Sequence, residues 1–427
     1  MAATWDDILT FFVVNFVTHA VTVRSLPGDR TADVAINTLI ALLFPFSGVW
    51  AGIMAIRRAS CLAKDQVQQA ARAGALCILV RTPKWVPRED EVVTGCVIDD
   101  AAYWNGSTRI KTTVKVEEEN MSTLGDVISP EEEVKVFGYQ GRENPRVVLP
   151  RDYRFQRIGR YVEIGSYAHF DVPSSRNLAK IFASIVQLLF ACGTLWRSRG
   201  RQLEQYGYAA FSLTVIPYAI MSLVNLIGNI VTPEYTHVYI VESEVLEEAR
   251  RRHITFDGTV SRVELREKEN VRIMDVHFSD KDGDNWFIRE ATVTELPEQV
   301  QGLLSITVPM GLYPNRAPDL PETIINALSY ILAVVVLAAP YAIIAGLTEF
   351  KPGHSTVSQR AWMLSWLVVG QVAGLVRAWL INRERIKTGS VRKYYLIILA
   401  ILFGSAGVGG FVNAGMMIKQ FGSCVVV

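Results

Sequence analysis

Long apolar runs separated by polar stretches are the dominant pattern of this 427-residue chain. A helix rises 1.5 Å per residue, so about twenty apolar residues cover the roughly 30 Å hydrocarbon core of a bilayer. The pattern predicts an α-helical polytopic membrane protein with about six transmembrane helices. The six predicted spans are Val34–Ile56, Leu178–Trp196, Tyr208–Val231, Ile324–Leu347, Trp362–Ile381 and Tyr395–Ile418.

The N-terminal segment Ile8–Val23 is apolar but short, and it contains Asn15 and His19. A secretory signal needs a basic start and a small-residue cleavage site, which this segment lacks. Residues 1–33 are therefore predicted to form an interfacial helix, with a full span as the alternative.

Two large polar inserts divide the spans into groups of one, two and three. Residues 57–177 are predicted to be a mixed α/β insert that begins with a helix continuing from the first span over 57–75. A flexible acidic loop follows around Glu117–Glu119 and Glu131–Glu133. The remaining divisions are a transmembrane hairpin over 178–231, a β-rich insert over 232–323 and three transmembrane helices over 324–427.

Apolar residues alternate with polar ones in the second insert, as in a small β domain. Phe256–Leu265, Val271–Ser279 and Asn285–Val293 are three strand-length runs separated by turn residues. They predict a three-stranded antiparallel meander, which Leu304–Val308 would close into a small barrel. Before them, Ser243–Arg252 is predicted to be a helix with Ser243 as its N-cap.

Composition narrows the class of function. Half of the residues are hydrophobic, a fifth are charged and the net charge is +1, which argues against a nucleic-acid partner. The five cysteines include no Cys-x-x-Cys pair, so neither a zinc site nor a disulfide framework is indicated. No catalytic or nucleotide-binding motif is found either. We therefore expect no enzyme, no catalytic residue, no cofactor and no metal.

Six spans would place both inserts on one face of the membrane. Lys and Arg are moderately more numerous on that face, so the positive-inside rule predicts cytosolic inserts in the plasma membrane or an endomembrane. The sequons Asn105-Gly-Ser107 and Asn120-Met-Ser122 favour the opposite orientation, because glycosylation requires a lumenal loop.

Amide side chains within the predicted spans are the candidate functional residues. An unpaired amide costs several kcal/mol in hydrocarbon, so these groups must face other helices or water. Four of them form a candidate polar path for a solute: Asn225, Asn229, Gln371 and Asn413. The alternative is ordinary hydrogen bonding between helices. Three prolines inside the spans, Pro45, Pro217 and Pro340, are expected to kink their helices.

Small residues on single helix faces predict close packing, either within one chain or between copies in a homo-oligomer. These residues are Gly370, Gly374, Ala406, Gly410 and Ala414.

Bases interleave with aromatic residues late in the first insert, which predicts contact with anionic lipid headgroups. The alternative is a polar face packed on the neighbouring acidic loop. The basic residues are Arg151, Arg154, Arg157 and Arg160.

The run Pro217–Tyr235, followed by Val238–Ala249, resembles a segment of an uncharacterised family of multi-pass membrane proteins in filamentous fungi. The resemblance implies a fungal source and the same layout of spans and soluble inserts. It implies no activity and no site residue.

Two functions remain from the sequence. The kinked, amide-bearing helices favour a channel- or transporter-like protein with cytosolic regulatory domains, whose substrate stays open. The large share of polar insert favours a membrane-anchored scaffold or sensor without transport activity.

Overall fold

A computed structural model of the chain describes residues 3–98, 110–117, 124–128, 136–137, 149–159, 164–165, 172–175, 177–256, 258–263, 273–282, 285–292, 304–309, 322–382 and 389–421. The chain folds as two compact units. The helical unit contains Met1–Leu62, Ser174–Glu234 and Leu320–Val427, and the β-rich unit contains Ala63–Pro173 and Tyr235–Asp319. The two inserts therefore belong to one unit.

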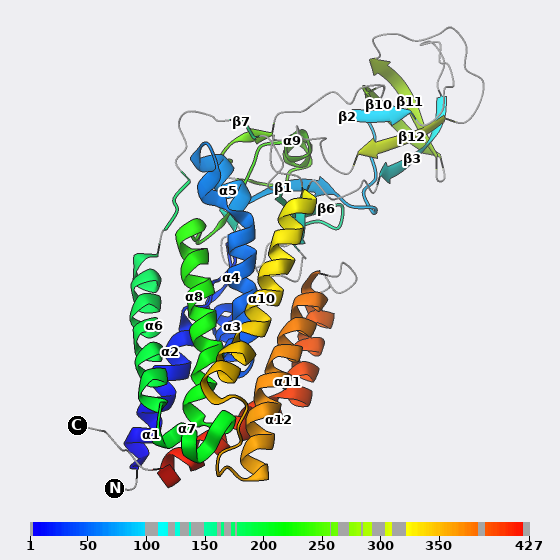
Figure 1. The fold of residues 1–427 in the computed structure, drawn as a ribbon. Coiled ribbons are helices and arrows are strands. Elements are labelled where there is room, and N and C mark those ends of the chain that lie inside the picture. The colour runs from blue at the N-terminus through cyan, green and yellow to red at the C-terminus, as the bar shows by residue number, and fades with distance from the viewer. Residues whose placement is uncertain are drawn as a thin grey trace. The chain divides into compact units, whose positions relative to one another are not determined.

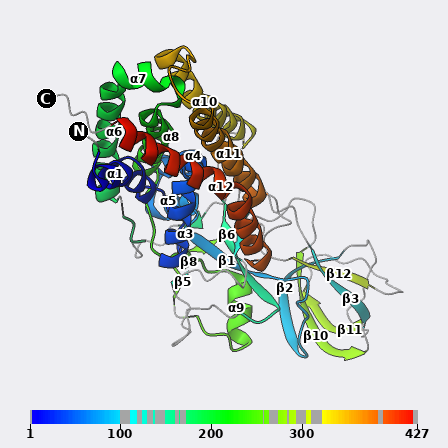
Figure 2. The same cartoon turned by 90° about the horizontal axis from the view of Figure 1, so that it is seen from below.

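The helical unit is a bundle of long helices (Figure 1). In sequence order its helices are α1 (Trp5–Phe12), the π-helix η1 (Val13–Val17), α2 (Thr18–Val21), α3 (Thr31–Leu43), α4 (Pro45–Arg58), η2 (Ser60–Leu62), α6 (Leu178–Ser198), α7 (Arg201–Tyr206), η3 (Gly207–Ala209), η4 (Phe211–Val215), α8 (Ile216–Val231), α10 (Glu322–Thr348), α11 (Val357–Asn382) and α12 (Gly389–Phe421). From below, α8 lies between α6 and α4, and α4 separates α8 from α11 (Figure 2).

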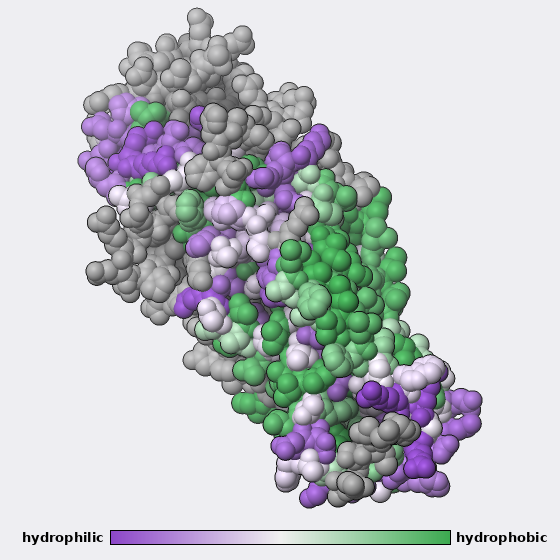
Figure 3. Space-filling view, turned by 90° about the vertical axis from the view of Figure 1, so that its left-hand side faces the viewer, coloured by the Kyte–Doolittle hydropathy of each residue, from purple (hydrophilic) through white to green (hydrophobic). Residues whose placement is uncertain are grey.

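Three helical segments among the described residues are long and apolar enough to cross a membrane: Leu178–Ser198, Phe211–Val231 and Thr323–Thr348. Large apolar side chains on α6 and α10 point outward, and the helical unit shows a continuous apolar surface bounded below by hydrophilic residues (Figure 3). Such a surface suits hydrocarbon rather than water. These features indicate association with a membrane, and the three segments coincide with three of the six predicted spans.

The prediction of one continuous span over Val34–Ile56 is wrong. Helix α3 ends at Leu43, Phe44 has φ −129° and ψ 80°, and Pro45 is the first residue of α4. Proline lacks an amide hydrogen, and its ring pushes the preceding residue out of the helical region. Pro45 therefore breaks the helix instead of kinking it.

The predicted continuation of this helix to residue 75 is also wrong. Helix α4 ends at Arg58, where Ala59 takes a left-handed conformation with φ 44°. A separate helix, α5 (Gln66–Ala73), begins after Asp65, whose side chain accepts a hydrogen bond from the Gln68 amide at 2.7 Å. This N-cap favours a new helix start over continuation.

The N-terminal segment lies alongside α8. Lys419 lies near the end of α12, and its ammonium nitrogen lies over the Trp5 ring, 5.6 Å from the ring centroid. Phe421 also contacts Phe211, just before α8 begins, with ring centroids 6.1 Å apart. At the other end, Arg24 donates hydrogen bonds to three carbonyls that close α8, those of Gly228, Thr232 and Pro233. Residues 5–24 therefore cover the same length of the bundle as α8.

The β-rich unit contains a sheet, a closed barrel and a short ribbon. Its five-stranded sheet has the order β4-β6-β1-β8-β5, the barrel has the order β10-β11-β3-β12-β2, and β7 pairs with β9. The strands are β1 (Leu76–Arg81), β2 (Glu91–Ile98), β3 (Ile110–Glu117), β4 (Leu124–Ile128), β5 (Val136–Phe137), β6 (Tyr153–Ile158), β7 (Ile164–Gly165), β8 (Val238–Ile240), β9 (Arg262–Val263), β10 (Ile273–Asp282), β11 (Asn285–Thr292) and β12 (Leu304–Pro309).

Both inserts contribute to the barrel. The second supplies β10, β11 and β12, close to three of the predicted strands, and the first supplies β2 and β3. In the described part of Phe256–Leu265, β9 is the one strand that forms, and it pairs with β7 instead of with a barrel strand. The predicted three-stranded antiparallel meander is wrong, because of its three strands only β10 and β11 pair with each other. Strand β3 lies between β11 and β12 and runs parallel to β12, and β2 closes the barrel between β12 and β10.

The predicted helix cap is confirmed. Helix α9 (Glu244–Arg251) follows Ser243, whose hydroxyl accepts a hydrogen bond from the Leu246 amide at 3.2 Å. The two sequons and most of the predicted acidic loop lie outside the described residues. These are Asn105, Asn120, most of Glu117–Glu119 and all of Glu131–Glu133.

Candidate functional site

One face of α8 carries a row of buried polar side chains. Ser222, Asn225 and Asn229 are three and four residues apart, so they project from one side of the helix. Their relative exposure is 0%, 0% and 3%. The sequence predicted that the two asparagines share a face, and the structure adds Ser222 to it.

The N-terminal helix and α6 supply the partners of Ser222. The Ser222 hydroxyl lies 2.6 Å from His19 Nδ1 and 3.3 Å from Gln187 Oε1. The Gln187 amide also donates to the Thr18 carbonyl at 2.8 Å. Since the amide oxygen can only accept, the Ser222 hydroxyl donates to it and accepts from His19 Nδ1. This assignment leaves Nε2 of a neutral His19 as an acceptor.

Several buried polar atoms around this row have no partner in the described part of the chain. They are His19 Nε2, the Ser47 hydroxyl and both amide atoms of Asn225 and of Asn229. Leaving such a group unsatisfied costs roughly 1–3 kcal/mol. We call His19, Gln187, Ser222, Asn225 and Asn229 the polar cluster. It contains donors and acceptors but no charged side chain, which suits water or a small neutral solute.

Close packing of α4 on α8 holds the asparagines in place. A Cβ on Gly52 would lie 2.8 Å from Asn225 Oδ1, and one on Gly228 would lie 3.2 Å from the Gly52 carbonyl oxygen. Glycine at both positions lets the two backbones approach. Asn225 is therefore confined by α4 without being hydrogen-bonded to it.

The other two residues of the candidate polar path lie elsewhere in the helical unit. Gln371 of α11 donates to the Leu337 carbonyl of α10 at 3.2 Å. Asn413 of α12 donates to the Gln359 carbonyl at 3.3 Å. Each amide thus joins a pair of helices, and the four residues do not form one row.

The small residues with predicted packing roles lie at contacts within the chain. A Cβ on Gly374 would approach Phe46 Cβ to 2.8 Å, and one on Gly410 would approach Trp366 Cβ to 2.7 Å. Ala414 is fully buried and Ala406 is half-buried. Gly370 differs, because a Cβ there would have no neighbour closer than 3.9 Å.

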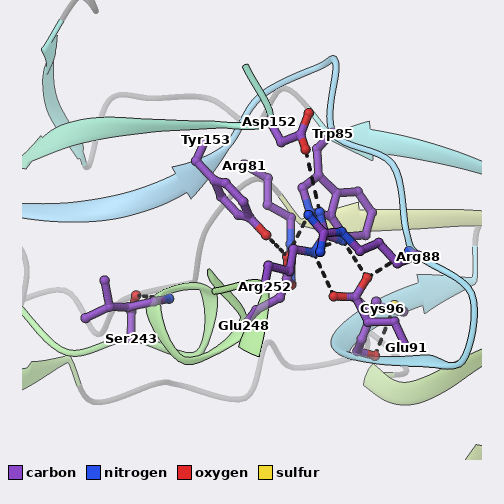
Figure 4. Close-up of polar contacts among 12 residues, drawn as sticks. Arg81, Trp85, Arg88, Glu91, Cys96, Asp152, Tyr153, Ser243, Glu248 and Arg252 are labelled. Carbon is purple, nitrogen blue, oxygen red and sulfur yellow. Dashed lines mark hydrogen bonds and ion pairs between the residues drawn. The ribbon is translucent and has the colours of Figure 1, made fainter. Parts of the chain in front are cut away.

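The β-rich unit holds a second buried polar group, which sequence reasoning missed (Figure 4). Glu248 of α9 accepts hydrogen bonds from Arg81 Nε at 3.0 Å, Trp85 Nε1 at 2.8 Å and the Tyr153 hydroxyl at 2.6 Å. Arg252, one turn along α9, bonds Glu91 at 2.7 Å. We call these six residues the charge cluster.

Electrostatics in the charge cluster favour the ionised carboxylate. Burial alone would raise the pKa of Glu248, but the positive charge and hydrogen bonds of Arg81, with help from Tyr153 and Arg252, lower the pKa below its ordinary value. Burial, followed by the Glu248 charge, raises the pKa of Tyr153. The guanidinium carbons of Arg81 and Arg252 both lie 5.0 Å from the centroid of the Trp85 ring. Both oxygens of Glu248 are thus occupied, and the cluster links α9 to β1, β6 and the start of β2.

Two sequence signals could have indicated this cluster. Arg81 ends a six-residue strand that is buried throughout, so its charge needs a partner. Glu248 and Arg252 are four residues apart on one helix. The alternation of apolar residues cannot identify the pairing of Arg81 with Glu248, because 167 positions separate them.

The basic residues predicted to contact lipid do not share one surface. Arg154 and Arg157 lie on strand β6, three positions apart, so they point to opposite faces of the sheet, and both are half-buried. Arg157 donates to the Gly74 carbonyl. Arg151 is exposed before the strand, and Arg160 lies outside the described residues. Lipid contact through these arginines stays a prediction.

No family model, curated protein or solved structure matches this chain. The resemblance to fungal membrane proteins therefore stays a prediction as well, and function is argued from the geometry of the chain.

Proposed function

We propose that this chain is a channel- or transporter-like multi-pass membrane protein that passes water or a small neutral solute along the polar cluster. The observation that supports the proposal is the set of four unpartnered amide atoms on Asn225 and Asn229. Amides buried without partners destabilise a bundle, so their presence is explained if a passing molecule hydrogen-bonds to them.

The residues of the proposed path differ from those predicted from the sequence. Gln371 and Asn413 already donate to backbone carbonyls, so we assign them to helix packing. His19 and Gln187 take their place, because both contact Ser222 on the same face of α8. A neutral cluster would not compensate an ion for its lost hydration, which is why the proposed solute is uncharged.

We further propose that all six predicted helical regions lie in the membrane and that the N-terminal segment crosses it with them. Supporting this, residues 5–24 cover the length of α8, and apolar residues are exposed at every fourth position: Trp5, Leu9, Val13, Val17 and Val21. Such a stripe suits contact with lipid along a crossing helix better than an interfacial position.

The test is flux through the purified chain in lipid vesicles. Light scattering after an osmotic step would report permeation of water, urea and glycerol. Replacing both Asn225 and Asn229 by Leu keeps the side-chain volume approximately constant and removes the amide groups. A passing solute then loses its hydrogen-bond partners, so we expect flux to fall at least tenfold.

Gln371→Leu is the matched control, since it removes an amide from a neighbouring helix pair and should leave flux unchanged. Equal flux in the double variant and the wild type would contradict the path. A wild type that passes none of these solutes would favour the alternative function.

That alternative is a membrane-anchored scaffold or sensor. The β-rich unit supports it, because it combines segments of both inserts into a sheet and a closed barrel with buried apolar cores. In the preferred proposal the same unit serves as a cytosolic regulatory domain.

A further inference from the structure

An apolar pocket lies where the three proline-containing helices of the bundle meet. Pro45 of α4, Pro217 of α8 and Pro340 of α10 all line it, and α11 closes the far side with Trp366 and Gly370. The proline and the tyrosine of both copies of the tetrapeptide Pro-Tyr-Ala-Ile, at residues 217–220 and 340–343, therefore line one space. The pocket is separate from the polar cluster and shares none of its residues.

The pocket exists because its walls are built from groups that prevent tight packing. Pro340 lies inside α10, where its ring displaces the backbone of the preceding turn, whereas Pro45 and Pro217 lie in the first turn of α4 and α8. Glycine contributes no side chain. A Cβ on Gly370 would still lie 3.9 Å from the nearest atoms, the Leu43 carbonyl oxygen and Pro45 Cδ. The internal volume is about 50 Å³. On such a measure one water needs roughly 10–15 Å³, so the pocket has room for a short length of chain.

Three polar side chains of the wall donate to backbone carbonyls. Tyr218 donates its hydroxyl to the Leu42 carbonyl, Thr214 donates to the Phe211 carbonyl, and Gln371 donates to the Leu337 carbonyl at 3.2 Å. The rest of the wall is mainly aliphatic and aromatic, including Val49, Leu213 and Ile344. A polar solute would find few free partners here, whereas a hydrocarbon chain needs none.

The pocket is accessible from the outer face of the bundle. Two of its lining residues are well exposed, Leu364 at 40% and Phe350 at 51%. Beside them, α10 has the composition of a membrane span and turns Val334, Val335 and Ile343 outward. In a bilayer the medium at this opening is the acyl region of the lipid.

We infer that this pocket binds one acyl chain of a membrane phospholipid, inserted between α10 and α11 against the proline-lined wall. The inference requires that α8 and α10 lie in the bilayer and does not depend on solute flux through the polar cluster. Absence of flux would therefore leave this inference standing, and absence of a bound acyl chain would leave the proposed path standing.

The experiment uses the full chain in lipid nanodiscs that contain a phosphatidylcholine with a diazirine near the end of one acyl chain. After illumination and digestion, mass spectrometry maps the labelled residues. We expect label on inward-facing wall residues, such as Leu213, Ile344 and Leu367, in addition to the outward faces of α6 and α10. Label confined to the outward faces of the helices in the wild-type protein would overturn the inference, independently of the result for any variant.

Substitutions then test occupancy of the pocket. Gly370→Leu fills the space, so label on the wall should fall at least fivefold, and Gly370→Ala should lower it less. Gly346→Leu on α10 is the matched control, because a Cβ there has no neighbour within 4 Å and Gly346 is not part of the wall. Label on Phe182 and Leu189 of α6 reports intact embedding and should stay constant in all variants.

Two further results would overturn the inference. One is that Gly370→Leu changes neither the labelling of the pocket wall nor the labelling of α6. The other is wall labelling by a free diazirine fatty acid but not by the phospholipid, which would assign the pocket to a different ligand.

Discussion

The polar cluster and the charge cluster differ in how completely their atoms are paired. In the charge cluster, Glu248 receives hydrogen bonds from Arg81, Trp85 and Tyr153. In the polar cluster, Asn225 and Asn229 have no partner among the described residues. A buried polar cluster whose atoms are all paired can be explained by its contribution to the stability of the fold. A cluster with unpaired atoms requires a further explanation, such as a bound molecule. The difference predicts opposite responses to mutation.

Glu248→Gln should give the largest effect. It removes the charge that compensates Arg81 and Arg252 inside the β-rich unit, and breaking a buried ion pair in this way costs about 3–5 kcal/mol. Hydrogen exchange measured by mass spectrometry on the full chain should show lower protection in β1, β6 and α9.

Glu242→Gln is the control for that substitution. Glu242 pairs with Arg250 at 2.7 Å, but this pair lies nearer the surface. Losing it should cost at most about 1 kcal/mol. If the two variants lose similar protection, the charge cluster is not the main link in the β-rich unit.

Acid should reproduce part of the Glu248→Gln effect. The pKa of Glu248 in the folded chain lies below the ordinary value of 4.5. Its contribution to stability is therefore present above that ordinary value and is lost as the pH falls through the folded pKa. Protection of α9 should decrease below about pH 4.5, and the decrease should be shallower in Glu248→Gln. Equal slopes in both proteins would assign the acid sensitivity to other groups.

The Asn225→Leu, Asn229→Leu double variant should change stability in the other direction. Replacing unpaired polar groups by apolar ones of similar size removes a desolvation cost of about 1–3 kcal/mol per group. The melting temperature in detergent should stay constant or rise, even as flux falls. A clear drop in melting temperature would mean that these amides have partners that matter for folding.

Removing the two glycosylation sequons should have no effect on glycosylation if the β-rich unit, which contains the charge cluster, lies in the cytosol. If the β-rich unit is cytosolic, Asn105 and Asn120 receive no glycan. Replacing both by Gln should then change the mass of the chain expressed in a eukaryotic cell only by the two added methylene groups, and glycosidase treatment should not change it further. A glycosidase-sensitive mass that disappears in the variant would put the β-rich unit in the lumen.

The sequence predicted features that depend on neighbouring residues. Apolar runs located α6, α8 and α10, alternation located β10 and β11, and Ser243 marked the start of α9. Pro45 was recognised as a perturbation, but only the conformation of Phe44 shows that the helix ends there.

Features that depend on distant residues could not be predicted in this way. The barrel partners β2 and β3 come from the other insert, and nothing in local alternation specifies which strands will pair. The same limit applies to the candidate site. Helical spacing placed Asn225 beside Asn229, but whether an amide has a partner depends on a distant carbonyl, such as Leu337 for Gln371.

The composite barrel has a consequence for how the protein is made. Strands β2 and β3 leave the ribosome long before β10, with α6 and α8 synthesised in between. Chains grow at roughly 5–20 residues per second, so the early strands wait on the order of ten seconds for their partners. During that interval their edges are open to wrong pairing. The barrel of this protein therefore cannot close until the second insert has emerged.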